Sequence, residues 1–141
     1  MVGLVIATHG RLADELVSTG EGIVGPMAAI ATSHVAPHAS ALEIHDQILE
    51  AVKKVDQGDG VLILADLLGG SPCAQSLPLC AQRQVEIVTG VNLPMLLKAN
   101  SLRLTVQSLE QLATDLAQYG QKNITRASAI IKDASGLTSA H

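Results

Sequence analysis

The stretch MVGLVIATHGRLADELVSTGEGIVGP, residues 1–26, joins an apolar run to a helical pattern through Thr8-His9-Gly10. The run Val2–Ala7 is continuous rather than alternating, which is typical of a strand buried on both faces of a parallel sheet. Residues 12–24 then place apolar side chains at helical spacing. A strand that leads directly into a helix is the first half of a strand-helix-strand unit, so this stretch predicts an α/β fold.

The same alternation continues along the chain. The runs Val61–Ala65 and Val85–Val88 predict two more central strands, and Ala28–Ser33, after the turn signal Gly25-Pro26, is a fourth candidate. Helical patterns cover residues 12–24, 42–52, 71–82 and 109–119. Because crossovers between parallel strands are right-handed, helices should cover both faces, and we expect a single-domain, doubly wound open sheet of mostly parallel strands.

The C-terminal part is less regular. Residues 124–131 include Ile130 and Ile131, which favour β-structure, so we expect a last, antiparallel strand there. The residues beyond it are mostly small and polar. We therefore expect the folded domain to cover residues 1–132 and a flexible tail to cover 133–141.

Composition excludes several functions for the 141 residues. The net charge is −4 and the nine Lys and Arg are scattered, which argues against binding to nucleic acid or to an anionic membrane surface. No apolar run is long enough to span a bilayer or to form a secretory leader, so we expect a cytoplasmic protein. Cys73 and Cys80 are spaced for neither zinc nor redox chemistry, and we expect no metal and no cofactor.

Polar residues follow two of the predicted strands where an open α/β sheet binds its ligands, at the carboxyl ends of the strands. His9 follows the first strand, and Asp66 follows Val61–Ala65. A neutral imidazole can attack phosphorus with one nitrogen while a carboxylate holds the proton on the other. His9 and Asp66 are therefore the candidate catalytic pair.

The sequence Gly69-Gly70-Ser71-Pro72 begins a predicted helix. Ser71 suits the N-cap, Pro72 suits the first helical position, and the glycines permit close approach of a ligand to the backbone. Free amides at such a helix start bind anions, so Gly69, Gly70 and Ser71, together with Thr8 beside His9, are the predicted phosphoryl-binding residues. The alternative is an ordinary helix cap after a tight turn. The roles of Arg11 and His34, near the same strand ends, stay open.

Three segments together resemble the mannose-type enzyme IIA domains of the sugar phosphotransferase system. They are VIATHG at residues 5–10, LADLLGGSP at residues 64–72 and GVNLPML at residues 90–96. Their order and spacing extend the resemblance over nearly the whole chain. In that family the histidine of the first motif is the phosphorylation site, and it corresponds to His9.

The resemblance implies a phosphotransferase that works as a relay. His9 would receive a phosphoryl group from the carrier HPr and pass it to an enzyme IIB domain, and the protein would be a homodimer in which residues 124–131 pair with the partner's sheet. Three alternatives stay open: the phosphocarrier subunit of dihydroxyacetone kinase, a histidine phosphatase, and a non-catalytic regulator. The sugar, and the choice between transport and regulation, are not determined.

Overall fold

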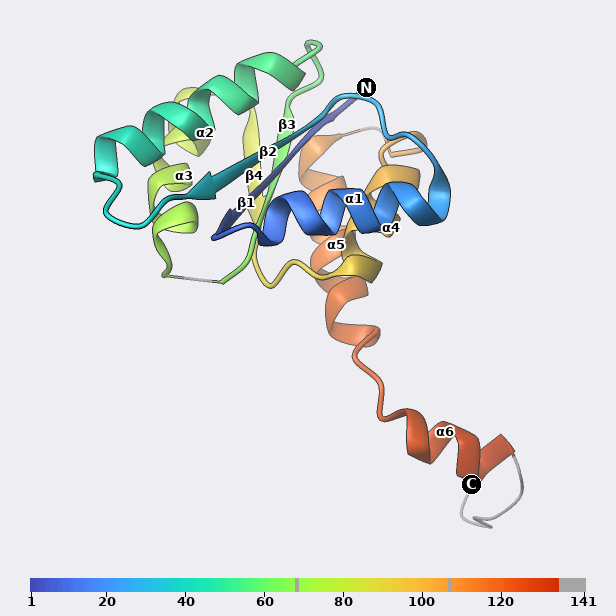
Figure 1. The fold of residues 1–141 in the computed structure, drawn as a ribbon. Helices are drawn as coiled ribbons and strands as arrows, with labels where there is room; N and C mark the ends of the chain where they lie inside the picture. The colour runs from blue at the N-terminus through green and yellow to red at the C-terminus, as the bar shows by residue number, and fades with distance from the viewer. Residues whose placement is uncertain (68, 107, 135–141) are drawn as a thin grey trace.

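The computed structural model describes residues 1–67, 69–106 and 108–134, with side chains described up to residue 131. Within these ranges it contains four strands and six helices (Figure 1). The elements follow in the order β1 (Gly3–His9), α1 (Leu12–Val24), β2 (Ile30–Val35), α2 (Ala41–Val55), β3 (Val61–Ala65), α3 (Ser71–Gln82), β4 (Val85–Val88), α4 (Leu93–Leu102), α5 (Leu109–Lys122) and α6 (Ala127–Ala134).

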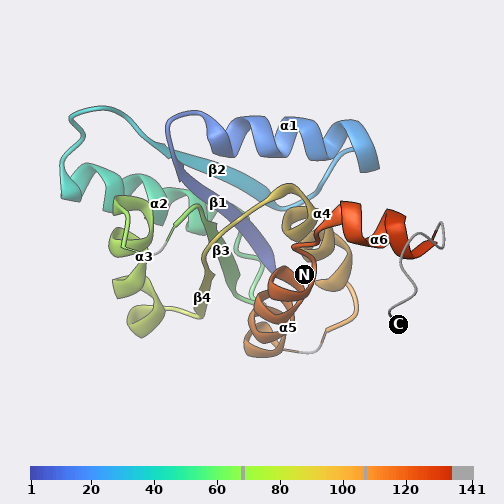
Figure 2. The ribbon, with the colours of Figure 1, turned by 90° about the horizontal axis from the view of Figure 1, so that it is seen from below.

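The four strands form one sheet in the order β2-β1-β3-β4, and every neighbouring pair is parallel. Helices α2 and α3 cover one face of this sheet, and α1, α4 and α5 cover the other, as Figure 2 shows. The predicted doubly wound α/β fold is therefore confirmed. The strand order reverses between β1 and β3, which places the ligand-binding end of the sheet at their carboxyl ends.

The central strands are apolar throughout because each supplies two cores. In β1, Leu4 and Ile6 pack under α4 and α5, whereas Val5 and Ala7 pack under α2, and all four side chains are fully buried. Side chains alternate along a strand, so a strand between two helical layers needs apolar residues at every position. This explains the continuous runs of the sequence.

Two of the predicted strands are shifted toward the C-terminus at both ends. β1 continues through Thr8 to His9, so His9 is the last strand residue, and β2 begins at Ile30 instead of Ala28. The guanidinium of Arg103 binds the carbonyls of Ala28 and Ala29, and Ala29 has a positive φ of 48°. The chain therefore still turns at Ala29 and enters the sheet only afterwards.

The sequence prediction missed helix α4. Its signals are present: the Asn92 side chain accepts a hydrogen bond from the Met95 amide at 2.9 Å, and Pro94 lies in the first turn. Met95, Leu96 and Ala99 are buried against the sheet and neighbouring helices. A short helix that is apolar on most sides lacks the two-faced pattern by which longer helices are found.

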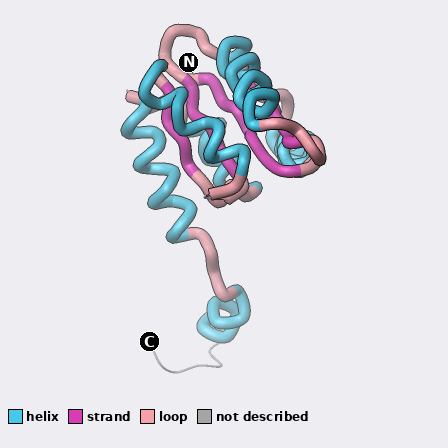
Figure 3. Tube along the Cα trace, turned by 90° about the vertical axis from the view of Figure 1, so that its left-hand side faces the viewer, coloured by secondary structure: helices cyan, strands magenta, loops and turns pink. Residues whose placement is uncertain are grey.

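The predicted strand over residues 124–131 is wrong, because residues 127–134 form helix α6. This helix stands away from the sheet after α5 (Figures 1 and 3), and Ile130 and Ile131 are 55% and 65% exposed. A strand needs a neighbour to complete its hydrogen bonds, whereas a helix completes them within itself, so a segment without a sheet beside it becomes helical. Most of the predicted tail, 133–141, lies outside the described residues.

Candidate active site

The end of β1 and the end of β3 meet because the two strands are neighbours in register, with Ala7 opposite Ala65. This brings His9 and Asp66 together, as the sequence predicted. Gly10 follows with a φ of 55°, a left-handed conformation that glycine adopts at little cost. The chain can therefore turn sharply after His9 and enter α1 without covering the ring.

One carboxylate oxygen of Asp66 holds His9 at two points. Asp66 Oδ2 accepts hydrogen bonds from the His9 ring Nδ1 at 2.7 Å and from the His9 backbone amide at 2.9 Å. An ionised carboxylate can only accept, so Nδ1 carries a proton, and in the neutral ring the lone pair lies on Nε2. The His9 side chain is 48% exposed and that of Asp66 only 11%. The arrangement presents a fixed, reachable nucleophile.

The ionisation of Asp66 is set by burial and by His9. Burial on its own raises the pKa of the carboxyl group. The hydrogen bonds from the His9 amide and ring, the charge of that ring and the Leu67 amide act in the opposite direction, and together they hold the pKa of Asp66 below its ordinary value of 3.8. Asp66 is therefore a carboxylate at neutral pH.

Helix α3 begins beside the His9 ring. Gly70 is its N-cap and Ser71 its first residue, so the prediction of Ser71 as the N-cap is wrong by one position. A Cβ atom on Gly70 would lie 2.8 Å from His9 Cε1 and 2.9 Å from Leu67 Cδ1, closer than real Cβ contacts. Glycine is therefore needed at position 70, because it lets the ring lie against the start of the helix.

Among the residues that the structure describes, the first amides of α3 have no acceptor. The first helical bond of this turn runs from Ala74 to the Gly70 carbonyl, and within the described chain no hydrogen bond is formed by the amides of Ser71 and Cys73. Gly69 has a φ of 83°, which shapes the turn into the helix. N–H groups at the start of a helix favour an anion, so binding of a phosphoryl group by this loop stays a prediction.

Thr8 does not contribute its side chain to this site. Its hydroxyl is fully buried and accepts a hydrogen bond from the Ala13 amide at 2.8 Å, which secures the first turn of α1. Successive residues of a strand face opposite sides, so Thr8 faces α1 while His9 faces the start of α3. The sequence prediction of Thr8 as a phosphoryl-binding residue overlooked this alternation.

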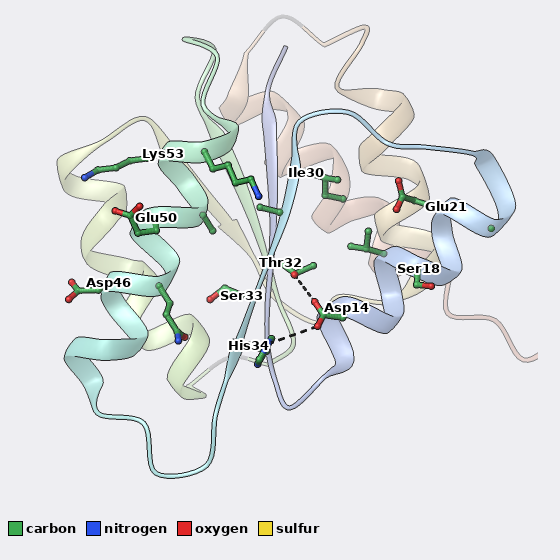
Figure 4. A pocket seen from close by; sticks show the side chains of 16 residues that line it. Asp14, Ser18, Glu21, Ile30, Thr32, Ser33, His34, Asp46, Glu50 and Lys53 are labelled. Carbon is green, nitrogen blue, oxygen red and sulfur yellow. Dashed lines mark hydrogen bonds and ion pairs between the residues drawn. The ribbon is translucent and has the colours of Figure 1, made fainter.

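Arg11 and His34 lie near the strand ends but outside the site. Arg11 is exposed, and among the described residues its side chain makes no hydrogen bond or ion pair. His34 lies opposite Thr8 in the register, and its Nε2 is 4.0 Å from Asp14 Oδ2, on the α1 side of the sheet (Figure 4). His34 therefore faces α1, whereas the His9 ring lies on the other side of the sheet.

Two further properties bear on the chemistry. In the part of the chain with described side chains, no three His, Cys, Asp or Glu come together in a metal-binding cluster. Across those residues, no helix has the length and apolar character needed to cross a bilayer.

The sequence comparisons agree with one another. A family model described as "PTS system fructose IIA component" (EIIA-man) matches residues 3–117. The mannose-specific EIIAB component of the phosphotransferase system from Escherichia coli K12 is 29% identical over 124 residues, which are 87% of this chain but only 38% of that protein. The fructose-specific EIIA component of Bacillus subtilis is 26% identical over 124 residues, 87% of this chain and 84% of that protein.

The fold comparisons lead to the same group. The mannose/sorbose-specific IIA subunit from Enterococcus faecalis has a TM-score of 0.79 and 29% identity, over 88% of this chain and 92% of that one. An EIIA component from Streptococcus agalactiae shares the fold with a TM-score of 0.83, at 23% identity, over 92% of this chain and 99% of that one. Since the family model covers well over half of the residues, the chain belongs to the mannose-type IIA family of the sugar phosphotransferase system.

Proposed function

We propose that His9 is a phosphoryl carrier, which accepts the group from the phosphohistidine of HPr and passes it to an enzyme IIB domain. The observation that carries the proposal is the asymmetry of the His9 ring. Its Nδ1 is held by Asp66, while the side chain is 48% exposed and its Cε1 lies against Gly70 at the start of α3. A ring that is oriented on one side and open on the other can react in one direction only.

In the accepting step, the Nε2 lone pair attacks phosphorus and the phosphorus–nitrogen bond to the donor imidazole breaks. The electron pair of that bond returns to the donor ring, and the His9 Nδ1 proton stays on its hydrogen bond to Asp66. A phosphorus–nitrogen bond replaces another, so the step is close to isoenergetic and needs positioning more than driving force. The passing step is the reverse, with the IIB acceptor as the nucleophile.

Two groups stabilise the charge that changes during transfer. The Asp66 carboxylate would stabilise the ring as it becomes cationic, and the amides at the start of α3 would bind the phosphoryl oxygens. Both are already in place in the free protein. Such preorganised groups act where charge develops and cost little rearrangement at the moment of reaction.

The test is phosphorylation by phosphoenolpyruvate, enzyme I and HPr, followed by transfer to a IIB domain. We expect one acid-labile, alkali-stable phosphohistidine, lost in His9→Ala. His34→Ala is the matched control, because its side chain is also 48% exposed and near a carboxylate but lies on the α1 side of the sheet. Full labelling of His9→Ala would disprove the proposal.

The same experiment separates the competing functions. A histidine phosphatase would release inorganic phosphate from small phosphomonoesters, and a dihydroxyacetone kinase subunit would pass its phosphoryl group to that kinase and not to IIB. A regulator would be phosphorylated without passing the group to either. Transfer to IIB with no release from a phosphomonoester is the result that supports the relay.

We also infer a homodimer, as the family resemblance implies, but without the predicted exchange of a strand. Ile130 and Ile131 on α6 are among the exposed apolar side chains, and we place the contact there because the predicted contact segment was residues 124–131. Sedimentation at micromolar concentration should therefore give a dimer, and Ile131→Lys should shift it toward monomer. A wild-type chain that sediments only as a monomer would contradict this inference.

A further inference from the structure

A groove runs along the outer edge of β2, on the flank of the sheet away from β3 and β4. Helix α1 forms one wall and α2 the other, and β2 lies between them (Figure 4). The groove encloses about 1410 Å³, more than the ~300–1,000 Å³ typical of small-molecule sites. Its size fits a length of polypeptide better than a metabolite.

The floor of the groove is a free strand edge. The Leu4 amide bonds to the Ala29 carbonyl, so in this parallel pair the alternate residues Ala31 and Ser33 also face β1. The N–H and C=O groups of the residues between them, Ile30, Thr32 and His34, therefore face the groove. Within the described chain they have no partner. A free edge of this kind is a template for one more strand.

The two walls differ in charge. The α1 wall carries two carboxylates, Asp14 and Glu21, and no cation. The α2 wall carries Asp46 and Glu50 with Lys53 and Lys54, which nearly cancel. The groove thus holds four carboxylates against two ammonium groups, and its excess negative charge lies on the α1 side. A segment with basic side chains directed at α1 complements it.

The carboxylates of the α1 wall are held in place before any ligand arrives. Asp14 Oδ1 accepts a hydrogen bond from the Thr32 hydroxyl at 2.6 Å, and Glu21 Oε2 accepts one from the Met27 amide at 2.9 Å. The second oxygen of Glu21 is kept for a partner, whereas that of Asp14 lies 4.0 Å from His34 Nε2, which a basic side chain would have to displace or join. Side chains that are already ordered lose less conformational entropy when they bind.

A second copy of the chain fits the groove less well. The β2 edge lies between two helices, and the same two helices would flank the edge of a second copy and meet the first pair before the strands could join. Each copy also brings the same negative excess, in a chain of net charge −4. Both observations favour a single, basic, extended chain.

We propose that this groove binds an extended segment of another protein, which adds to β2 as a fifth strand and directs basic side chains at alternate positions toward α1. The outward groups of β2 span residues 30–34, so the segment is about five or six residues long. The backbone edge supplies affinity, and Asp14 and Glu21 supply specificity. The proposal is independent of His9, and its test does not involve phosphorylation.

The probe is the synthetic peptide acetyl-Thr-Lys-Val-Lys-Val-Lys-Thr-amide, and the measurement is amide hydrogen exchange by NMR. We expect the amides of Ile30, Thr32 and His34 to exchange more slowly when the peptide is bound. The amides of Ala31 and Ser33 already bond to β1 and serve as references in the same strand. Protection that alternates along β2 is the signature of an added strand.

Two sets of controls separate edge pairing from attraction between opposite charges. The same peptide, N-methylated along its central residues, keeps its charge but cannot pair with an edge, and should give no protection. The double variant Asp14→Asn/Glu21→Gln should bind roughly three- to tenfold more weakly. The matched double variant Glu15→Gln/Glu110→Gln changes net charge equally outside the groove, and should bind as the wild type does.

Three results would overturn the proposal. One is that the lysine peptide gives no alternating protection of β2 at millimolar concentration. Another is that the N-methylated peptide binds as well as the unmodified one. The third is that the same three amides become protected without peptide as protein concentration rises, which would make a second copy the occupant.

Discussion

At the carboxyl end of the sheet the His9 side chain is 48% exposed, whereas at the amino end Arg103 is only 4% exposed. Both are nitrogen-bearing side chains held by oxygen atoms. His9 is held by a single carboxylate oxygen. Arg103 donates to the carbonyls of Val2, Ala28 and Ala29 and to the Asn100 side chain.

The two groups differ in how many of their nitrogen atoms already form hydrogen bonds within the protein. His9 leaves one ring nitrogen free beside the open amides of α3, so that end can take part in chemistry. The terminal nitrogens of Arg103 donate hydrogen bonds to backbone carbonyls. These bonds connect the start of β1 to the turn before β2. Burial lowers the pKa of Arg103, but a guanidinium stays charged at neutral pH. In the proposed function one end of the sheet carries the reaction, and the other end stabilises the fold.

The substitution Arg103→Met should show most clearly that the two ends of the sheet have different roles. The change removes the guanidinium from three carbonyl acceptors, of which Ala29 keeps the Leu4 amide as a donor, and should lower the free energy of unfolding by about 3–5 kcal/mol. Folded protein should still be phosphorylated to the wild-type extent. Arg83→Met removes an exposed cation and should change stability by less than about 0.5 kcal/mol. Chemical denaturation measures both, and equal effects would mean that Arg103 is not a structural clamp.

Gly70→Val should do the opposite, with a large effect on transfer and a small one on folding. Its side chain would occupy the space of His9 Cε1 and displace the ring. A displacement of about 1 Å can reduce a transfer rate roughly a hundredfold. Gly22→Val, which meets open space on α1, is the control for added bulk. A wild-type rate for Gly70→Val in rapid-quench kinetics would mean that the loop does not take part in transfer.

Asp66→Asn tests whether the carboxylate charge matters beyond its shape. Asn still accepts a hydrogen bond but does not stabilise a cationic ring, so both half-reactions should slow by roughly tenfold or more. If the rates for Asp66→Asn equal those of the wild type, the role of Asp66 is structural.

The same variant gives a pH signature. The pKa of Asp66 is lowered in the folded state, so its contribution to stability is present above the ordinary value of 3.8 and is lost as pH falls through the lower, folded value. The stability difference between wild type and Asp66→Asn should therefore be constant near neutral pH and shrink below pH 3.8. A difference that grows on acidification would contradict the assigned direction.

Ser71→Ala should have the smallest effect. Gly70, not Ser71, caps α3, so no cap hydrogen bond is lost and stability should change by less than about 0.5 kcal/mol. Loss of one hydroxyl contact to the phosphoryl group should slow transfer less than about fivefold. A thermal melt that shows a loss of 1 kcal/mol or more would mean that the hydroxyl supports the helix start after all.

The sequence predicted those parts of the molecule that depend on strongly apolar strands and on their ends. Val61–Ala65 and Val85–Val88 were located to the residue, and the pairing of His9 with Asp66 follows from adjacent parallel strands. These features are local, or depend on a single topological rule. They are readable because burial on both faces leaves few alternatives for those residues.

The errors have tertiary causes. The start of β2 is set by Arg103, which lies more than 70 residues away in the sequence. The residues around Ala28 do not indicate that contact. Residues 127–134 are helical because no strand edge lies beside them. The β-propensity of Ile130 and Ile131 does not indicate whether such an edge is present. Propensity is overridden wherever distant contacts decide the structure.

The two hydrogen bonds between Asp66 and His9 affect how phosphoryl groups pass through the proposed relay. Because one oxygen bonds both the ring and the backbone of His9, the ring cannot swing from one direction to another while that hold lasts. Donor and acceptor must then use the same approach to Nε2, so they exclude each other. An excess of unphosphorylated IIB would compete with phospho-HPr for the carrier, and the flow of phosphoryl groups would depend on the ratio of the two partners as well as on their amounts.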